Sequence, residues 1–342
     1  MNKLHLIGMS AALVTSLAAA SGQEAAADAA KLRAYVQLPS QKPQELLLDS
    51  SNGADKFYYI QKGTDQQMEM NVASCRLFYI QTPADLAQAL STFREGNLSA
   101  ARKQLAAVKT KYARYAGLPG SPVTIAAINE ITAAVRMQDW AEVTKLIAAF
   151  PSSEGLTAAD QARLKAAEII AATDDTPDSL DKQKQAIAAL LKDKKLGRHI
   201  SSELYAWLRY ALARAYAAQI PAAEQNAIPA EKVKAASDAV DNYAQCAIGT
   251  HGIAPELPAD AMGRAVALLA AMPGVADYMK KADAGNMTKA VWSAAPPAFR
   301  DAAAMASLLK NVYAVEGTAL PPIVETMAGY YFNSAAGTAT GK

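Results

Sequence analysis

The earliest regular pattern of apolar and polar residues runs from residue 33 to residue 81. Apolar and aromatic side chains alternate there with polar ones in five short runs, at residues 34–38, 44–48, 56–60, 68–72 and 76–80. Residues that favour turns separate the runs, at 39–43, 50–53 and 62–65. A period of two broken by such turns predicts four or five antiparallel strands in a small sheet or partly closed barrel. A module of this size is marginally stable alone, so we expect it to pack against the segment that follows.

From Thr82 onward the apolar period becomes helical and remains so to residue 333. We expect Thr82 to be the N-cap of the first helix and Pro83 to lie in its first turn. The predicted helices are at 86–93, 98–112, 125–135, 140–150, 160–172, 180–196, 201–219, 231–247, 258–272, 275–284, 297–315 and 321–332. Short breaks between neighbours predict helical hairpins.

Two of these breaks resemble the turn inside a tetratricopeptide repeat (TPR). In residues 93–101 (FREGNLSAA) an aromatic residue precedes Gly-Asn, and a small alanine follows; residues 135–143 (VRMQDWAEV) are similar, with Gln138 in place of the glycine. The helix at 204–216 is similar to the first helix of such a repeat. The two turns are 42 residues apart, which is longer than the usual repeat of about 34. The resemblance covers residues 83–245.

The resemblance implies a mainly α fold, an irregular TPR-like α-solenoid at 82–333 preceded by the small antiparallel β module at 33–81. A strand-rich module followed by such repeats is also similar to uncharacterised envelope proteins of the Verrucomicrobia type. What the family implies is a fold and a habit of binding proteins or peptides along a concave surface; it implies no chemistry.

The N-terminal residues are typical of an export signal. Lys3 supplies a positive charge, residues 6–17 are apolar, and Ala18 and Ala20 fit the small-residue cleavage rule. We therefore predict a signal peptide at 1–20, a polar lead-in at 21–32 and a disordered tail at 334–342. The apolar stretch is too short to span a membrane, no lipoprotein cysteine follows it, and no later segment reaches spanning length. The predicted location is periplasmic or secreted.

The charge balance argues against a nucleic-acid partner. The chain has 34 basic and 32 acidic residues among 342, for a formal charge of +2, and their order builds no long stripe of one sign. Cys75 and Cys246 are the two cysteines. They could form a single bridge, or they could remain reduced and buried, Cys75 in a strand and Cys246 in a helix.

Residues for catalysis or metal binding are scarce. Once the signal is removed, His199 and His251 are the remaining histidines, and the chain has no H-E-x-x-H or paired C-x-x-C motif. Cys246 and His251 could be imagined as nucleophile and base, but a loop histidine beside a buried thiol is the ordinary explanation. Lys192, Lys194 and Lys195 are expected to favour a helix C-terminus rather than to bind an anion. We predict no catalytic residue, no cofactor and no metal.

The aromatic residues are the most suggestive set. Most should pack between helices, but some could line a groove for an extended ligand. The candidate partner-binding residues are Tyr205, Tyr210, Arg214, Tyr112 and Tyr115. The sequence thus predicts an exported, non-catalytic adaptor or scaffold that binds a protein or peptide of the cell envelope. The alternative is a carbohydrate-binding protein or envelope hydrolase with its site on the tyrosine-rich helix face or the β module.

Overall fold

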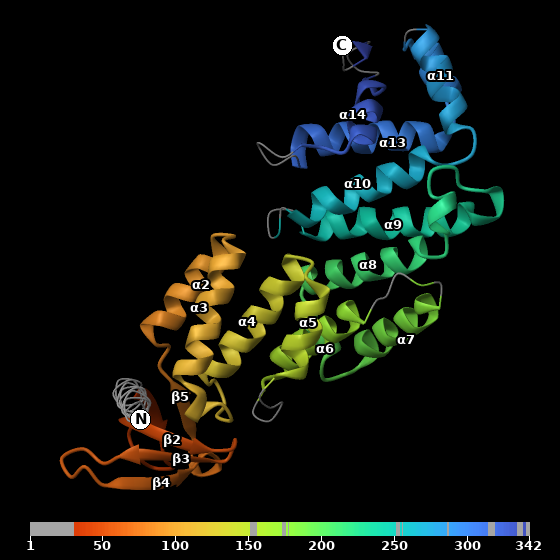
Figure 1. The fold of residues 1–342 in the computed structure, drawn as a ribbon. Helices are drawn as coiled ribbons and strands as arrows, with labels where there is room; N and C mark the ends of the chain where they lie inside the picture. Colours follow the sequence, from red (N-terminus) through yellow and green to blue (C-terminus); the bar gives the residue numbers. More distant parts are fainter. Residues whose placement is uncertain are drawn as a thin grey trace, which may run out of the picture. The chain divides into compact units, whose positions relative to one another are not determined.

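A computed structural model of the chain is shown in Figure 1. It describes residues 31–150, 156–172, 176, 178–250, 254, 256–285, 287–313, 319–333 and 338–339. The predicted signal peptide at 1–20, the lead-in up to residue 30 and His251 lie outside these residues. Close contacts divide the chain into two compact units, which we call the first unit (residues 1–137 and 145–160) and the second unit (residues 138–144 and 161–342).

The first unit contains the predicted strands. The five form an antiparallel sheet in the order β4-β3-β2-β1-β5. Their bounds are β1 (Leu32–Gln37), β2 (Gln44–Asn52), β3 (Lys56–Ile60), β4 (Gln67–Asn71) and β5 (Leu77–Ile80). The sheet predicted from the alternation is confirmed. β1 starts inside the predicted lead-in, because Leu32 pairs with Leu48 of β2 and is buried.

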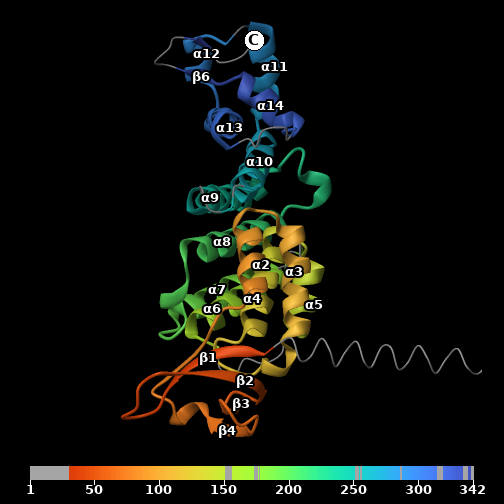
Figure 2. The ribbon, with the colours of Figure 1, turned by 90° about the vertical axis from the view of Figure 1, so that its left-hand side faces the viewer.

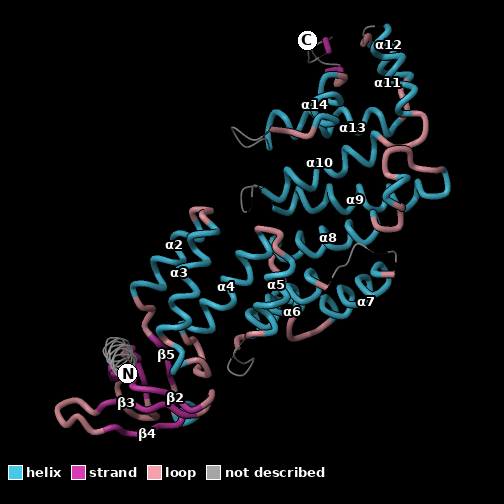
Figure 3. The backbone as a smooth tube through the Cα atoms, in the orientation of Figure 1, coloured by secondary structure: helices cyan, strands magenta, loops and turns pink. Residues whose placement is uncertain are grey.

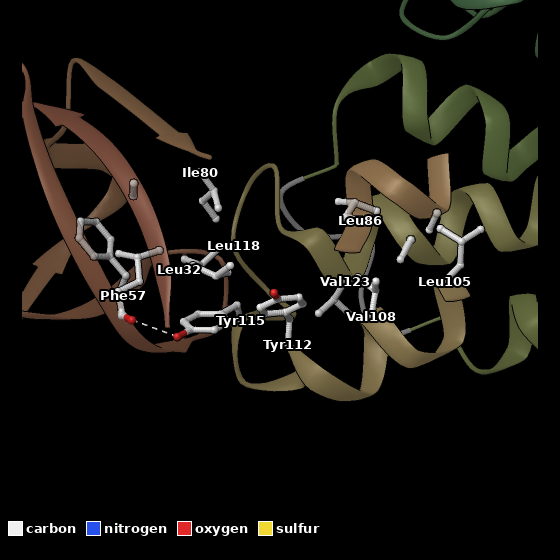
Figure 4. Close-up of a cluster of buried hydrophobic side chains, with 14 of the residues drawn as sticks. Leu32, Phe57, Ile80, Leu86, Leu105, Val108, Tyr112, Tyr115, Leu118 and Val123 are labelled. Carbon is white, nitrogen blue, oxygen red and sulfur yellow. Dashed lines mark hydrogen bonds between the residues drawn. The ribbon is translucent and has the colours of Figure 1, made fainter. Parts of the chain in front are cut away.

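One face of the sheet packs on the helices of the same unit. Along β1, Leu32, Ala34 and Val36 are buried while Arg33 and Tyr35 are exposed. The buried face continues into an apolar cluster with side chains from the helices (Figure 4). The sheet therefore shares one core with α2 (Ala84–Arg94), α3 (Leu98–Lys111) and α4 (Pro122–Arg136), as its small size required.

The turns at Gly96–Asn97 and Gln138–Asp139 have a similar local geometry. Gly96 has φ +82° and Gln138 has φ +56°, so both lie in the left-handed region. The next residue caps the following helix in each case: Ala100 N donates to Asn97 Oδ1 (3.3 Å) and Glu142 N donates to Asp139 Oδ1 (3.2 Å). The left-handed residue reverses the chain and the Asx side chain satisfies a free helix N–H. Gln138 thus takes the conformation that glycine has at the other turn.

The expected cap of the first helix was wrong. The residue before α2 is Pro83, which has no side-chain capping bond. Asp85, inside the first turn, instead accepts from Leu86 N at 2.9 Å. A carboxylate there satisfies the free N–H and favours the positive end of the helix dipole, so a threonine cap is not needed.

Most of the second unit is helical (Figures 1 to 3). Two helices are divided between the units. The second unit contains the first turn of α5 (Trp140–Ala148) and most of α6 (Ala158–Ala171). The other helices are α7 (Ser179–Lys192), α8 (Ser202–Ala217), α9 (Val233–Thr250), α10 (Glu256–Ala270), α11 (Val275–Gly285), α12 (Lys289–Ala294), α13 (Pro297–Leu308) and α14 (Pro322–Gly329). Helices α8, α9 and α10 pack side by side in chain order. Helix α12 was not predicted.

The C-terminal part of the chain departs from the predicted boundaries. Helix α13 ends at Leu308 and a π-helical turn, Leu309–Tyr313, follows. Helix α14 ends at Gly329, so the predicted helix to Phe332 was too long. Two-residue strands β6 (Phe332–Asn333) and β7 (Thr338–Ala339) pair with each other. The predicted tail at 334–342 therefore includes strand residues, because Phe332 is buried and extended pairing satisfies its neighbours.

Both cysteines are free thiols. Cys246 is buried in α9, as predicted, whereas Cys75 lies in the loop before β5 rather than in a strand. Among the described residues, no single helix has the length and apolar character for a membrane span; a sharply bent pair, Leu257–Ala270 with Val275–Asp283, passes the same test when taken together.

Candidate binding groove around Tyr205

Two of the five candidate residues belong to the core of the first unit. Tyr115 is fully buried, and its hydroxyl donates to the carbonyl of Leu48 at 3.0 Å (Figure 4). Tyr112 is 4% exposed and its hydroxyl donates to Asp85 at 3.1 Å. Burial raises the pKa of both phenols. Their rings fill the space beneath the sheet, so they do not present a surface to a partner.

Tyr210 is also a core residue, in the second unit. It is fully buried in a row of edge-to-face rings in the order Trp140, Trp207, Tyr210 and Tyr243, with centroid spacings of 6.2, 5.7 and 5.6 Å. Its hydroxyl donates to Asp260 of α10, and burial raises its pKa strongly. Arg214 lies over the Trp140 ring at 5.1 Å from its centroid, so its cation packs on this row.

Tyr205 lies differently from the other tyrosines. It is half-buried, three residues into α8, and it lines two hollows that meet at its ring. The larger hollow, about 500 Å³, lies between the end of α7, the start of α8 and the end of α9. The smaller, about 170 Å³, runs between α7 and α8. Leu191 lines both as well, so the two hollows are neighbours, and we call them together the Tyr205 groove.

The Tyr205 ring is held by its neighbours on α8 and α9. Arg209, one turn along α8, stacks on the ring at 4.9 Å and donates from Nε to the hydroxyl at 2.9 Å. The same guanidinium donates from Nη1 to Oδ1 of Asn242 on α9 at 3.0 Å. Asn242 is buried, and its Nδ2 donates to the Asp238 carbonyl at 2.7 Å. These contacts fix Tyr205 at the wall of the groove and tie α8 to α9.

Apolar side chains form much of the groove. Leu191 is 40% exposed and Ile248 is 75% exposed, the largest exposed fraction among the large apolar residues described. Two glycines also line the groove, and each lies against a neighbouring segment: a Cβ on Gly249 would be 3.1 Å from Ala206 Cβ, and one on Gly197 would be 2.5 Å from the Leu191 carbonyl. The close α8–α9 contact at Gly249 leaves Ile248 projecting beside it.

Among the described residues, those that line the groove include two cations and no carboxylate. Lys184 and Arg209 line its narrow part, and Ser201, Ser202 and Gln245 supply polar atoms to the wide part. Ser201 Oγ accepts from Leu204 N at 3.2 Å and so caps α8. Apolar contact area, a half-buried tyrosine and a positive wall together can bind a segment of another chain.

Outside the groove, the groups to consider among the described residues are the potential metal ligands and the two cysteines. No group of three His, Cys, Asp or Glu side chains there is placed to hold a metal ion. Burial raises the pKa of the Cys246 thiol strongly, with Asp260 adding to the effect, and burial also raises that of Cys75. A thiol with a raised pKa is a poor nucleophile. The pairing of Cys246 with His251 as a catalytic dyad falls partly outside the described residues.

Tyr205 is among the candidates predicted from the sequence, but the other residues that line the groove are not. Ile248 lies one residue past the predicted end of the helix at 231–247, and α9 extends to Thr250. On α9 the residues Asp241, Gln245 and Ile248 are all exposed and lie at helical spacing, opposite the buried stripe that contains Tyr243 and Cys246. An isoleucine on a polar helix face was the signal that could have identified this position.

Comparison with known proteins adds no relative. No family model, no curated protein and no solved structure matches the chain.

Proposed function

We propose that this protein is an exported, non-catalytic adaptor that holds a segment of another protein in the Tyr205 groove. The observation that carries the proposal is the apolar wall of the groove, in which Ile248 is 75% exposed beside a positioned tyrosine. Water-exposed apolar area of this kind is unfavourable in a monomer unless something covers it, and a half-buried tyrosine suits a contact that is apolar on one side and polar on the other. Export is proposed from the signal-like residues 1–20.

A second proposal concerns the arrangement of the helices. We infer an irregular TPR-like solenoid, supported by the left-handed residue and Asx cap that Gly96–Asn97 and Gln138–Asp139 share. Packing of α8, α9 and α10 in succession is the arrangement that a stack of helical hairpins requires.

Site-specific photocrosslinking tests the adaptor proposal. A photoreactive amino acid replaces Ile248 in the full chain, expressed in its own cell envelope, and crosslinked products are identified by mass spectrometry. Val312, 56% exposed on the same unit, is the matched control position. We expect a defined adduct, mapped to one segment of one protein, from position 248 and not from 312. Equal labelling from both positions, or recovery of the chain in the cytoplasm, would contradict the proposal.

A second candidate function rests on the sheet. Tyr35 and Tyr79 are directly opposed on β1 and β5, and they are 38% and 53% exposed on the face away from the core. Two tyrosines side by side on a flat sheet face suit stacking on sugar rings, with Arg33 and Glu45 beside them as hydrogen-bonding groups. Binding to a glycan array that is lost in Tyr79→Ala and retained in Ile248→Asp would favour carbohydrate binding over the adaptor function.

A further inference from the structure

We propose that the segment held in the Tyr205 groove is an acidic amphipathic helix of a partner protein. The inference rests on the proposed adaptor function and adds the chemistry of the partner. It is carried by three features of the second unit: an uneven distribution of charge, the shape and lining of the groove, and the absence of a carboxylate among the residues that line it.

The positive charge of the chain is concentrated beside the groove. Residues 182–200 contain six lysines and arginines and one aspartate, a formal charge of +5 in a chain whose total is +2. The six are Lys182, Lys184, Lys192, Lys194, Lys195 and Arg198, and all are exposed. Of these, Lys184 lines the groove itself, with its ammonium over the Tyr216 ring, and Lys182 lines a separate hollow. A favourable interaction with the C-terminus of α7 accounts for Lys192, which is in the last turn of that helix. Lys194, Lys195 and Arg198 lie past the helix end, in the exposed segment between the groove residues Leu191 and Ile200.

The acidic residue inside this run does not offset its charge toward a ligand. Asp193 accepts from Lys195 N at 2.7 Å and from Leu196 N at 2.8 Å, and these backbone bonds lower its pKa. Its carboxylate is thus directed into the turn after α7. Glu203 on α8 and Asp241 on α9 are near in sequence to groove residues, but neither lines the groove. A bound anion therefore meets cations without a facing carboxylate.

The groove has the lining that an amphipathic helix needs. Its apolar contacts come from Ile187, Leu191, Leu208, Leu212, Ile200 and Ile248. Lys184 to Leu191 alone covers eight residues of α7, or about 10 Å of rise, and the wide part beside α9 extends the groove further. Two turns of a bound helix have that length and present apolar residues at spacings of three and four, which is the usual mode of binding for a helix in a groove.

Nucleic acid and anionic lipid are less compatible with these features. Base stacking needs exposed aromatic rings, and Tyr205 is the one aromatic residue that lines the groove. A lipid surface needs a flat or convex basic face with projecting apolar groups, whereas Leu191 and Tyr205 line a depression. Both remain distinguishable outcomes of the test below.

Fluorescence anisotropy with designed 18-residue helical peptides tests the inference on the full chain. One peptide carries leucines on one face and glutamates on the other, a second replaces every glutamate by lysine, and a third has the acidic composition in scrambled order. We expect the acidic amphipathic peptide to bind at least tenfold more tightly than the other two, and its affinity to fall steeply with added salt because exposed charges are screened.

Matched variants locate the binding. The triple substitution Lys192→Gln, Lys194→Gln and Lys195→Gln should weaken binding of the acidic peptide about tenfold, and Ile248→Asp should weaken it at least as much. Lys280→Gln, Lys281→Gln and Lys289→Gln, which remove the same charge from exposed positions on α11 and α12, should leave it unchanged. Circular dichroism of each variant verifies that the fold is retained.

The outcomes separate the two proposals. If the lysine peptide binds as tightly as the acidic one and Ile248→Asp abolishes both, the groove binds helices and the inference about acidic partners is wrong. If vesicles with one third anionic lipid, or a single-stranded oligonucleotide, bind more tightly than the acidic peptide and depend on the same lysines, the partner class is wrong. If no peptide binds and position 248 yields no crosslink, the adaptor function itself fails.

Discussion

Tyr115 in the first unit and Tyr205 in the second unit differ in what covers their rings. Tyr115 in the first unit and Tyr205 in the second both come from Ala-rich helical surroundings, and both hydroxyls are hydrogen-bonded. Tyr115 is enclosed by a sheet on one side and helices on the other, so it has no exposed surface. Tyr205 has helices on one side and a groove on the other.

This difference shows what turns an aromatic residue into a candidate contact. Aromatic side chains at helical spacing are core wherever a second layer covers them, as the sheet covers Tyr115. At Tyr205 the layer is incomplete, because α7 ends at Lys192 and the chain turns away at Gly197. The end of a neighbouring helix, and not the residue type, creates the groove.

Removing the two rings should give the sharpest contrast. Tyr115→Ala deletes a fully buried ring and should lower the free energy of unfolding by about 3–5 kcal/mol. Tyr205→Ala, at a half-exposed site, should lower it by about 1 kcal/mol. Urea unfolding followed by circular dichroism measures both. The comparison fails if the two losses are equal.

Tyr115→Phe keeps the ring but removes the hydroxyl that donates to the Leu48 carbonyl. Its loss in free energy of unfolding should lie between those of the two alanine variants, at about 1–3 kcal/mol.

Each unit has a glycine at a close contact, and replacing it by alanine tests how tightly the two segments pack there. A Cβ on Gly117 would lie 2.5 Å from the backbone carbonyl carbon and oxygen of Gly53, so neither side can move as a side chain would. Gly117→Ala should cost about 2–3 kcal/mol of stability. On Gly249 the nearest atom would be a side-chain carbon, Ala206 Cβ at 3.1 Å, and Gly249→Ala should cost about 1 kcal/mol. Gly329→Ala, where the added Cβ would meet nothing within 4 Å, is the neutral control. If its urea-unfolding midpoint shifts as much as that of Gly117→Ala, the close contact with Gly53 is not the cause of the loss.

Helices and strands could be predicted from the sequence better than the burial of the residues in them. Alternation located all five strands, because one face of the sheet is buried and the other is not. The turns at Gly96–Asn97 and Gln138–Asp139 were located by chemistry that acts within a few residues. The burial of Tyr112, Tyr115 and Tyr210 depends on which element covers them, and that is a property of tertiary packing. Helix α12 was missed because its six residues are too few to show a helical period.

The groove could be anticipated in part. Tyr205 is among the residues predicted from the sequence, but as one of several aromatic residues without a criterion to rank them. Leu191 and Ile248 lie 57 positions apart in the sequence and meet in the fold at one hollow. No local pattern joins them. From the sequence alone, the lysines at 192, 194 and 195 are explained by a helix end; the structure ends α7 at Lys192, so that explanation covers Lys192 and not the other two.

Asp85, which accepts from Tyr112, and Asn242, which accepts from the Arg209 guanidinium that holds Tyr205, predict different responses of stability to pH. Burial alone would raise the pKa of Asp85, but bonds from Lys111 (2.8 Å), the Leu86 N–H and Tyr112 outweigh it and hold that pKa below its ordinary value of 3.8. A lowered pKa in the folded state means that ionised Asp85 stabilises the fold above pH 3.8, and that this contribution is lost as the pH falls below it. The melting temperature of the wild type should therefore approach that of Asp85→Asn on acidification.

Asn242 provides the matched control in the second unit. Its amide, which accepts from Arg209, does not titrate, so the difference between the wild type and Asn242→Ala should stay constant over the same pH range. A difference for Asp85→Asn that persists unchanged to pH 2 would show that the charge of Asp85 contributes nothing to the α2–α3 hairpin.

Ile248→Asp should have a small effect on stability, although we expect a large effect on binding from it. Ile248 is 75% exposed, so Ile248→Asp removes little buried area and should change the free energy of unfolding by less than about 0.5 kcal/mol. Leu105→Asp, at a fully buried position of α3, should prevent folding because it buries an unpaired charge. Chemical unfolding measures the first and the yield of folded protein the second. A loss of several kcal/mol in Ile248→Asp would mean that this side chain belongs to the core of the second unit. The groove would then have no exposed apolar wall for a partner to cover.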